Sequence, residues 1–339
     1  MTLFSNTGRR GFMAHAFAGS AAAMLLSAPV RAAATAASDF GPLKHIRTSL
    51  LDIAYAEIGP ANGKPVLLVH GWPYDIYTYA DAAKALGAQG YHVFVPYLRG
   101  YGATLFLSDA TPRNGQQAAL AMDALDFLDA LGIKQAIVGG CDWGARTACI
   151  LAALHPDRVR ALVSVSGYLI GSQAGNVKPL SPEAERRWWY QFYFATERGR
   201  QGYAANTHDF ARLIWKTASP RWAFDEATFA RSAAAFDNPD HVAISIHNYR
   251  WRLGLAEGEP RYDAIEAQLA TFPTIAVPTI TLEGDENGAP HPLPQDYRAK
   301  FTGAYEHRTS VGGVGHNLPQ EAPQDFARAI VDADRMAGR

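Results

Sequence analysis

This chain of 339 residues has no marked excess of positive or negative charge and contains few cysteines. The 31 lysines and arginines nearly balance the 32 aspartates and glutamates, so the formal net charge is −1. Without a basic excess or a polybasic segment, the chain lacks the charge pattern of a protein that binds nucleic acid or a membrane surface. The sequence also contains no metal-ligand cluster and no cofactor fingerprint. It therefore favours a small neutral substrate and water as partners, with no nucleic acid, metal or cofactor.

The two cysteines, Cys141 and Cys149, are eight residues apart. If both lie on one helix, the helical rise separates them by about 12 Å, which exceeds the reach of a disulfide. We therefore expect two unpaired thiols that pack as small buried apolar residues.

Long apolar runs are missing beyond the first residues. The start of the chain combines paired arginines, Arg9 and Arg10, with a weakly apolar, alanine-rich stretch over residues 14–26 and small residues over 29–34. This pattern is typical of a twin-arginine export signal that is cleaved near residues 32–36. The alternative is a membrane anchor, but the stretch falls short of the roughly 20 apolar residues that a spanning helix needs.

Export has two consequences. We exclude residues 1–37 from the fold as the signal, and we expect the mature protein in the periplasm or outside the cell. After signal cleavage we expect no stable membrane anchor.

The remaining chain alternates between strand and helix patterns. Strand-like runs cover residues 66–69, 91–96, 136–138, 159–166 and 278–282, and helical patterns cover 117–131, 145–154 and the stretch after 322. Continuous apolar runs separated by helices are typical of buried parallel strands. The alternation predicts an α/β fold with a mostly parallel sheet and helices on both faces.

Between residues 171 and 270 the pattern changes. Aromatic residues become dense, strand-like runs are few, and Ser-Pro and Asn-Pro pairs separate short helical stretches. We interpret residues 171–270 as a helical lid that is inserted into a core formed by residues 38–170 and 271–339.

Residues 140–144 read Gly-Cys-Asp-Trp-Gly between a strand and a helix. The form Gly-x-nucleophile-x-Gly is that of a nucleophile elbow, a sharp turn that needs small flanking residues and exposes its central side chain. The alternative is an ordinary strand–helix turn in which Asp142 caps the helix. An aspartate in this position also carries chemical information. Carboxylate attack on a saturated carbon gives an ester that water can cleave, whereas serine would give a stable ether.

A histidine in a glycine-rich loop, His316, and an acid after the strand 278–282, Asp285, complete the order nucleophile, acid, histidine. We predict that His316 activates the hydrolytic water and that Asp285 orients the imidazole. Glu283 and Glu286 are neighbouring acids. The backbone N–H groups of Trp72, in His-Gly-Trp-Pro, and Trp143 are predicted to stabilise the oxyanion.

The chain resembles epoxide hydrolases of the α/β-hydrolase fold over nearly all of residues 45–335. The matching segments are 70–73, 99–102, 140–144, 190–194, 249–250, 285 and 315–316. This resemblance implies that Tyr190 and Tyr249 in the lid donate protons to the epoxide oxygen, beside Asp142 as nucleophile. On composition alone, the two tyrosines would be taken as part of the lid core. The chain departs from the usual pattern at Cys141 and Tyr97, which suggests a divergent branch.

Two other functions stay open. A haloalkane or haloacid dehalogenase uses the same kind of aspartate; here Trp143 would suit halide binding and Arg146 could bind a carboxylate. Haloalkane dehalogenases, however, usually have Asn or Glu where this chain has Trp72. The other alternative is a ligand-binding protein on a hydrolase fold that has lost catalysis.

Overall fold

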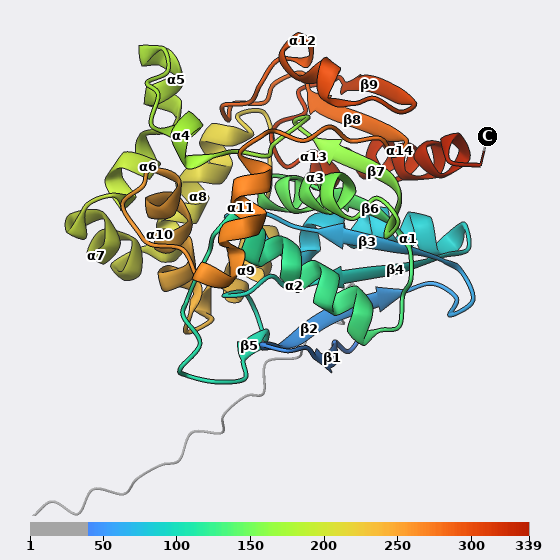
Figure 1. Cartoon of the computed structure of the whole chain (residues 1–339), viewed down its shortest axis with the longest axis horizontal. Helices are drawn as coiled ribbons and strands as arrows, with labels where there is room; N and C mark the ends of the chain where they lie inside the picture. Colours follow the sequence, from blue (N-terminus) through green and yellow to red (C-terminus); the bar gives the residue numbers. More distant parts are fainter. Residues whose placement is uncertain (1–39, 339) are drawn as a thin grey trace, which may run out of the picture. The chain divides into compact units, whose positions relative to one another are not determined.

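A nine-stranded sheet organises residues 40–338, which are the residues that this computed structural model describes (Figure 1). The predicted export signal lies outside them. The strand order is β1-β2-β4-β3-β6-β7-β8-β9, and β5 pairs with β2. The strands are β1 (Lys44–Arg47), β2 (Leu51–Ile58), β3 (Lys64–Val69), β4 (Tyr91–Pro96), β5 (Leu105–Phe106), β6 (Ala136–Gly140), β7 (Val159–Val165), β8 (Thr279–Gly284) and β9 (Tyr305–Ser310).

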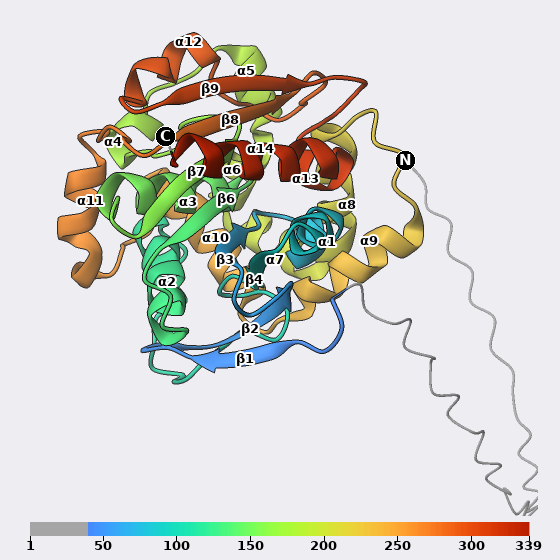
Figure 2. The ribbon, with the colours of Figure 1, turned by 90° about the vertical axis from the view of Figure 1, so that its right-hand side faces the viewer.

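The neighbours from β4 through β9 pair in parallel, whereas β1 and β5 pair with β2 and β2 pairs with β4 in antiparallel fashion. The central strands β3 and β6 are buried along most of their length because helices cover both faces of a parallel sheet. One face carries α2 (Gln117–Ala130) and α3 (Trp143–Leu154), and α1 (Ala80–Ala88) packs with α14 (Pro323–Met336) on the other (Figure 2). The predicted α/β class is confirmed.

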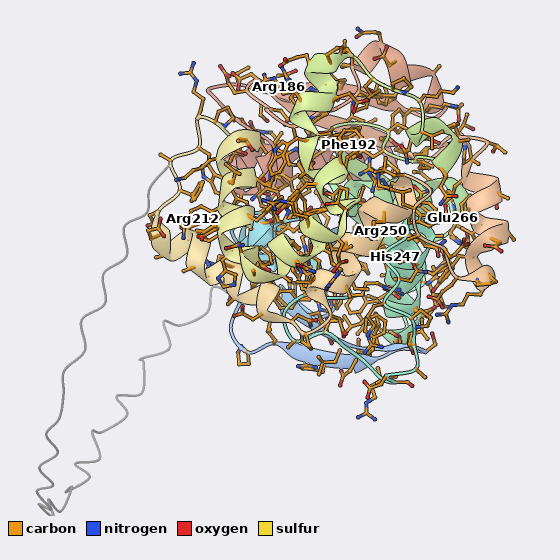
Figure 3. The ribbon with its side chains drawn as sticks, turned by 90° about the vertical axis from the view of Figure 1, so that its left-hand side faces the viewer. Arg186, Phe192, Arg212, His247, Arg250 and Glu266 are labelled. Atoms are coloured by element: carbon orange, nitrogen blue, oxygen red, sulfur yellow. The ribbon has the colours of Figure 1, made fainter. Side chains whose placement is uncertain are left out.

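The segment between β7 and β8 contains helices and no strand. Its helices are α4 (Gln173–Asn176), α5 (Pro182–Arg187), α6 (Trp189–Phe194), α7 (Glu197–Ala205), α8 (Thr207–Ala218), α9 (Glu226–Ala233), α10 (His241–Arg252) and α11 (Asp263–Leu269). Figure 3 faces this segment, with Arg186 on α5, Phe192 on α6 and Arg250 on α10 marked. We call residues 171–270 the lid. Within residues 40–338, no helix combines the length and the apolar character needed to cross a bilayer.

Buried hydrogen bonds join the lid to the loop after β3. The indole N–H of Trp72 donates to the Tyr203 hydroxyl over 2.9 Å, and that hydroxyl lies 2.8 Å from Nε2 of His241. His241 is bonded in turn to the carbonyl of Gly100 at 2.9 Å. Burial lowers the pKa of His241 to about 3, so the ring is neutral at ordinary pH. This connection fixes the lid above the carboxyl end of β3.

The short elements complete the chain. They are α12 (Pro294–Tyr297) and α13 (Leu318–Glu321), with 3-10 turns at Ile76–Tyr79, Ala234–Asp237, Pro260–Tyr262 and Arg298–Lys300. Both cysteines are free and buried, as expected. The Cys141 thiol lies 3.3 Å from the carbonyl of His316.

Candidate active site

The turn between β6 and α3 holds Asp142 in a backbone conformation that L-residues rarely adopt, with φ 55° and ψ −120°. The glycines on either side permit this turn. A Cβ on Gly140 would lie 2.2 Å from the carbonyl oxygen of Gly144, and a Cβ on Gly144 would lie 1.7 Å from that of Val69. Only glycine fits both positions without movement of the backbone. The arrangement is the strained elbow that the sequence predicts, and strain of this kind typically costs about 1–3 kcal/mol.

The carboxylate of Asp142 meets groups from two other loops. Its Oδ1 accepts the backbone N–H of Trp72 at 2.8 Å, and its Oδ2 lies 3.6 Å from Nε2 of His316. Burial raises the pKa of Asp142, but His316, Arg146 and the Trp72 N–H together outweigh burial and hold the pKa below its usual value. Asp142 is therefore an ionised carboxylate with one oxygen tied to a backbone donor.

The second predicted oxyanion donor, Trp143, is the first residue of α3. Amides in the first turn of a helix have no intrahelical acceptor, so this N–H is available to a ligand. The indole of Trp143 is buried, and its Nε1 has no hydrogen-bond partner among residues 40–338.

Tyr190 and Tyr249 come from two lid helices, α6 and α10, and their rings lie 5.4 Å apart. The Trp72 ring is 5.1 Å from that of Tyr190 and 5.2 Å from that of Tyr249. Burial, with the charge of Asp142 as a further contribution, raises the pKa of both phenols above 10. Both side chains are therefore protonated donors at neutral pH. The structure thus brings the two tyrosines together above the elbow.

A cavity of about 710 Å³ connects these groups. Its wall includes Asp142, His316, Tyr190, Tyr249 and Trp72. No group of three or more potential metal-ligating side chains occurs in the described part of the chain. The groups that the wall offers include the Asp142 carboxylate, the His316 imidazole and the two phenols.

Known proteins share this architecture. The model of the alpha/beta hydrolase fold matches residues 64–256. Epoxide hydrolase A of Mycobacterium tuberculosis is 31% identical over 309 residues, 85% of this chain and 95% of that protein. A crystal structure from Klebsiella pneumoniae, of a protein provisionally assigned as an epoxide hydrolase, is 62% identical with a TM-score of 0.87, covering 88% of this chain and 99% of that one.

The chain belongs to the α/β-hydrolase fold family. Some curated relatives match over a smaller part: Epoxide hydrolase 2 of Siraitia grosvenorii is 36% identical over 127 residues, 37% of this chain. This match spans about two fifths (38%) of that relative's length.

One predicted member of the site, Asp285, lines the same cavity but is bonded to other groups than expected. Asp285 is expected to orient the His316 ring, but its exposed carboxylate accepts the backbone N–H groups of Gly312, Gly313 and Val314 at 2.9, 3.0 and 2.8 Å. These three bonds lower the pKa of Asp285. Successive N–H groups of a glycine turn form a nest that favours a carboxylate. Asp285 therefore orders the loop that leads to His316 and does not contact its ring, so the predicted role is corrected.

Nδ1 of His316 is buried and has no hydrogen-bond partner within residues 40–338. The loop that carries His316 is instead held through its backbone. The N–H of His316 donates to Oγ of Ser219 at 2.9 Å, and Ser219 donates to Oε1 of Glu321 at 2.6 Å. Glu321 also accepts the N–H groups of Gly315 and Asn317, at 2.7 and 3.0 Å.

Sequence analysis missed both Ser219 and Glu321. Ser219 follows α8 in the lid, 97 residues before His316. A signal for Glu321 existed, because an acid shortly after a glycine-rich histidine loop can cap that loop. Burial raises the pKa of Glu321, although hydrogen bonds and His316 oppose this. Together, Ser219 and Glu321 hold the position of His316 relative to the lid.

We predict that Ser219→Ala slows the step that depends on His316. A lost hydrogen bond to a charged partner is worth about 1.5–3 kcal/mol, so breakdown of an enzyme-bound ester should slow roughly tenfold or more while its formation stays nearly unchanged. Stopped-flow tryptophan fluorescence separates the two steps. Thr207→Ala is the control, because within residues 40–338 that lid hydroxyl is bonded to the carbonyl of Tyr203, four residues earlier, and not to the His316 loop. Equal effects on both steps would refute the positioning role.

Proposed function

We propose that this hydrolase converts an epoxide to a vicinal diol through an ester on Asp142. The observation that carries the proposal is the single cavity wall shared by Asp142, His316, Tyr190 and Tyr249. A carboxylate, a base and two phenols are the groups that ring opening followed by ester hydrolysis requires. The names of the relatives, which are epoxide hydrolases, support the same reaction.

In the first step, Oδ2 of Asp142 attacks a ring carbon and the C–O bond on that carbon breaks. Oδ1 is the less free oxygen, because it already accepts the Trp72 N–H. The departing oxygen takes a proton from Tyr190 or Tyr249, whose phenols stay protonated at neutral pH. The product is a hydroxyalkyl ester of Asp142 and one phenolate.

In the second step, Nε2 of His316 accepts a proton from water, and the resulting hydroxide attacks the ester carbonyl carbon of Asp142. The negative charge develops on Oδ1, next to the backbone donor of Trp72, and Trp143 offers a second N–H. Losing one such donor typically costs roughly 100- to 1,000-fold. Collapse releases the diol and restores the carboxylate, and the proton on His316 returns to the phenolate through solvent.

Halide release fits the cavity less well. A dehalogenase needs N–H donors that face the leaving halide, and the chain has two candidate indoles. The indole of Trp72 donates to Tyr203, and Trp143 is buried away from the wall of the 710 Å³ cavity. A purely ligand-binding role does not explain why the nucleophile and His316 lie 3.6 Å apart in one cavity.

Export is also part of the proposal. It rests on the paired arginines and the alanine-rich stretch within residues 1–37. We propose that the mature enzyme acts in the periplasm or outside the cell.

We predict that His316→Gln protein forms the ester but cannot hydrolyse it. With styrene oxide in excess, intact-protein mass spectrometry should show the added mass of one epoxide, and peptide mapping should place it on Asp142. The His316→Gln/Asp142→Asn double variant is the matched control and should stay unmodified. Diol formation by the wild type, without halide release from a haloacid, is expected in parallel. Unmodified His316→Gln protein, or halide release without diol, would contradict the proposal.

We predict that Tyr190→Phe or Tyr249→Phe slows ester formation and spares ester hydrolysis. General acid catalysis contributes roughly 100- to 10,000-fold. Since one phenol remains, each single variant should lose less, about tenfold, and the double variant far more. Tyr193 lies on the same helix as Tyr190 but outside the cavity wall, so Tyr193→Phe serves as the control. If neither single variant nor the double variant altered the rate of ester formation, the donor assignment would be wrong.

A further inference from the structure

Four arginines lie in the wall of the cavity that holds Asp142, and two of them, Arg186 and Arg187, pair with Glu183, which leaves Arg146 and Arg252. Arg146 lies one helical turn after Asp142, on α3, and Arg252 is the last residue of α10. Both also line an adjoining cavity of about 640 Å³, whose other wall residues include Trp188, Trp251 and Ile170. The two cavities share wall residues, so they are two parts of one binding region.

Neither guanidinium has a carboxylate within ion-pair distance among residues 40–338. Nε of Arg146 donates to the carbonyl of Leu169 at 2.9 Å. Arg252, only 8% exposed, lies over the rings of Trp188 and Tyr249, 5.1 and 5.6 Å from their centroids. Burial, with a further contribution from the charge of Arg252, lowers the pKa of Arg146 to about 10, so Arg146 keeps its positive charge at neutral pH. The guanidinium of Arg252 is the second positive charge of this pair.

The nearby acids are engaged with other groups. Glu183, in the wall of both cavities, pairs with Arg186 and Arg187 at 2.7 and 3.4 Å. Glu266 on α11, labelled in Figure 3, accepts hydrogen bonds from two glutamine side chains and one backbone N–H. The charge of Asp142 interacts with that of Arg146, but Asp142 is the proposed nucleophile. Arg146, Arg252 and Asp142 together leave one uncompensated positive charge.

Buried charges are costly unless paired, and a guanidinium binds a carboxylate through two parallel N–H donors. We propose that Arg146 and Arg252 form a carboxylate subsite, so that the preferred substrate is an epoxide that carries one carboxylate. This inference rests on the proposed function. One negative charge on the ligand would balance the excess positive charge in the cavity. The net charge of the whole chain, −1, suggests only a neutral substrate.

The positions of the two arginines limit the distance between the carboxylate and the epoxide. The backbone N–H of Arg146 donates to the carbonyl of Asp142 at 3.1 Å, and the charge of Arg146 helps to lower the pKa of the Asp142 carboxyl, so Arg146 lies close to the attacking carboxylate. Arg252 contacts the ring of Tyr249, which we propose as a proton donor to the epoxide oxygen. The carboxylate should therefore be attached directly to a ring carbon, as in a glycidic acid. The aromatic wall of the adjoining cavity suits an aryl group on the other carbon.

A matched pair of substrates tests this subsite. Trans-3-phenylglycidate and trans-3-phenylglycidamide have nearly the same shape, but only the acid is charged. Wild-type enzyme should prefer the acid in kcat/KM by tenfold or more. Arg252→Gln should reduce that preference, the ratio of kcat/KM for acid to that for amide, tenfold to a hundredfold, as expected for a hydrogen bond to a charged group. Arg252→Lys should retain part of the preference, since it keeps the charge.

Arg250→Gln is the matched control. Arg250 lies on the same helix, is labelled in Figure 3, and lines neither of the two cavities. The variant should keep the full preference for the acid. Equal kcat/KM for acid and amide in the wild type, or a preference that Arg252→Gln leaves intact, would overturn the subsite while the proposed epoxide chemistry stood.

Binding of an unreactive acid separates the two proposals. Titration of wild-type protein with 3-phenylpropanoate and 3-phenylpropanamide, followed by calorimetry, should show tighter binding of the acid, lost in Arg252→Gln. If the acid binds in this way while neither glycidic compound yields a diol, the subsite stands and the proposed reaction fails. Equal binding of acid and amide would contradict the subsite whatever the outcome with epoxides.

Discussion

The strained turn at Asp142 is the constraint on which the rest of the site depends. A positive φ at an aspartate is tolerated here because β6 and α3 are both anchored in the sheet layers and because the flanking glycines allow the backbone to approach Val69 closely. The turn lifts the carboxylate out of the sheet, to where the loop after β3 supplies the Trp72 N–H. The loop after β9 places Nε2 of His316 3.6 Å from the other carboxylate oxygen, Oδ2. Three loops at the carboxyl ends of parallel strands thus converge on one side chain.

The lid contributes more than a cover. It supplies both phenols, it holds Trp72 through Tyr203, and it holds the backbone of His316 through Ser219. The hydrolytic base is thereby tied to the lid rather than to an acid on its ring. Within residues 40–338, Nδ1 of His316 has no hydrogen-bond partner, so no acid orients this ring there. In the proposed mechanism, ester hydrolysis would therefore be the less completely supported step, whereas ester formation would have an ionised carboxylate and two phenol donors in place.

The sequence was sufficient for the fold class and for the local parts of the site. Gly140, Asp142 and Gly144 belong to a motif of five residues, and the motif itself shows that small residues flank the aspartate. The glycine-rich segment before His316 is an equally local signal. Asp285 shows the limit of such reasoning. Its position after β8 suggested the ring of His316, but three N–H groups of a glycine turn compete for the same carboxylate and bind it.

The residues that sequence analysis missed act over long separations. Ser219 reaches His316 across 97 residues, and Arg252 meets the site only because α10 folds back over the elbow. Their roles depend on how the lid packs, which no short motif encodes. The balance of charge shows the same limit, since a net charge of −1 for the chain says nothing about an excess of positive charge inside one cavity.

A single turnover in ¹⁸O-labelled water, with enzyme in excess over epoxide, tests the central claim most directly. If water attacks the carbonyl carbon of an ester on Asp142, the label enters the Asp142 carboxylate and the first diol released carries none. Peptide mapping by mass spectrometry reads both products. Label in the diol and an unlabelled Asp142 peptide would mean that water opens the epoxide directly, and the account of a covalent nucleophile would fall.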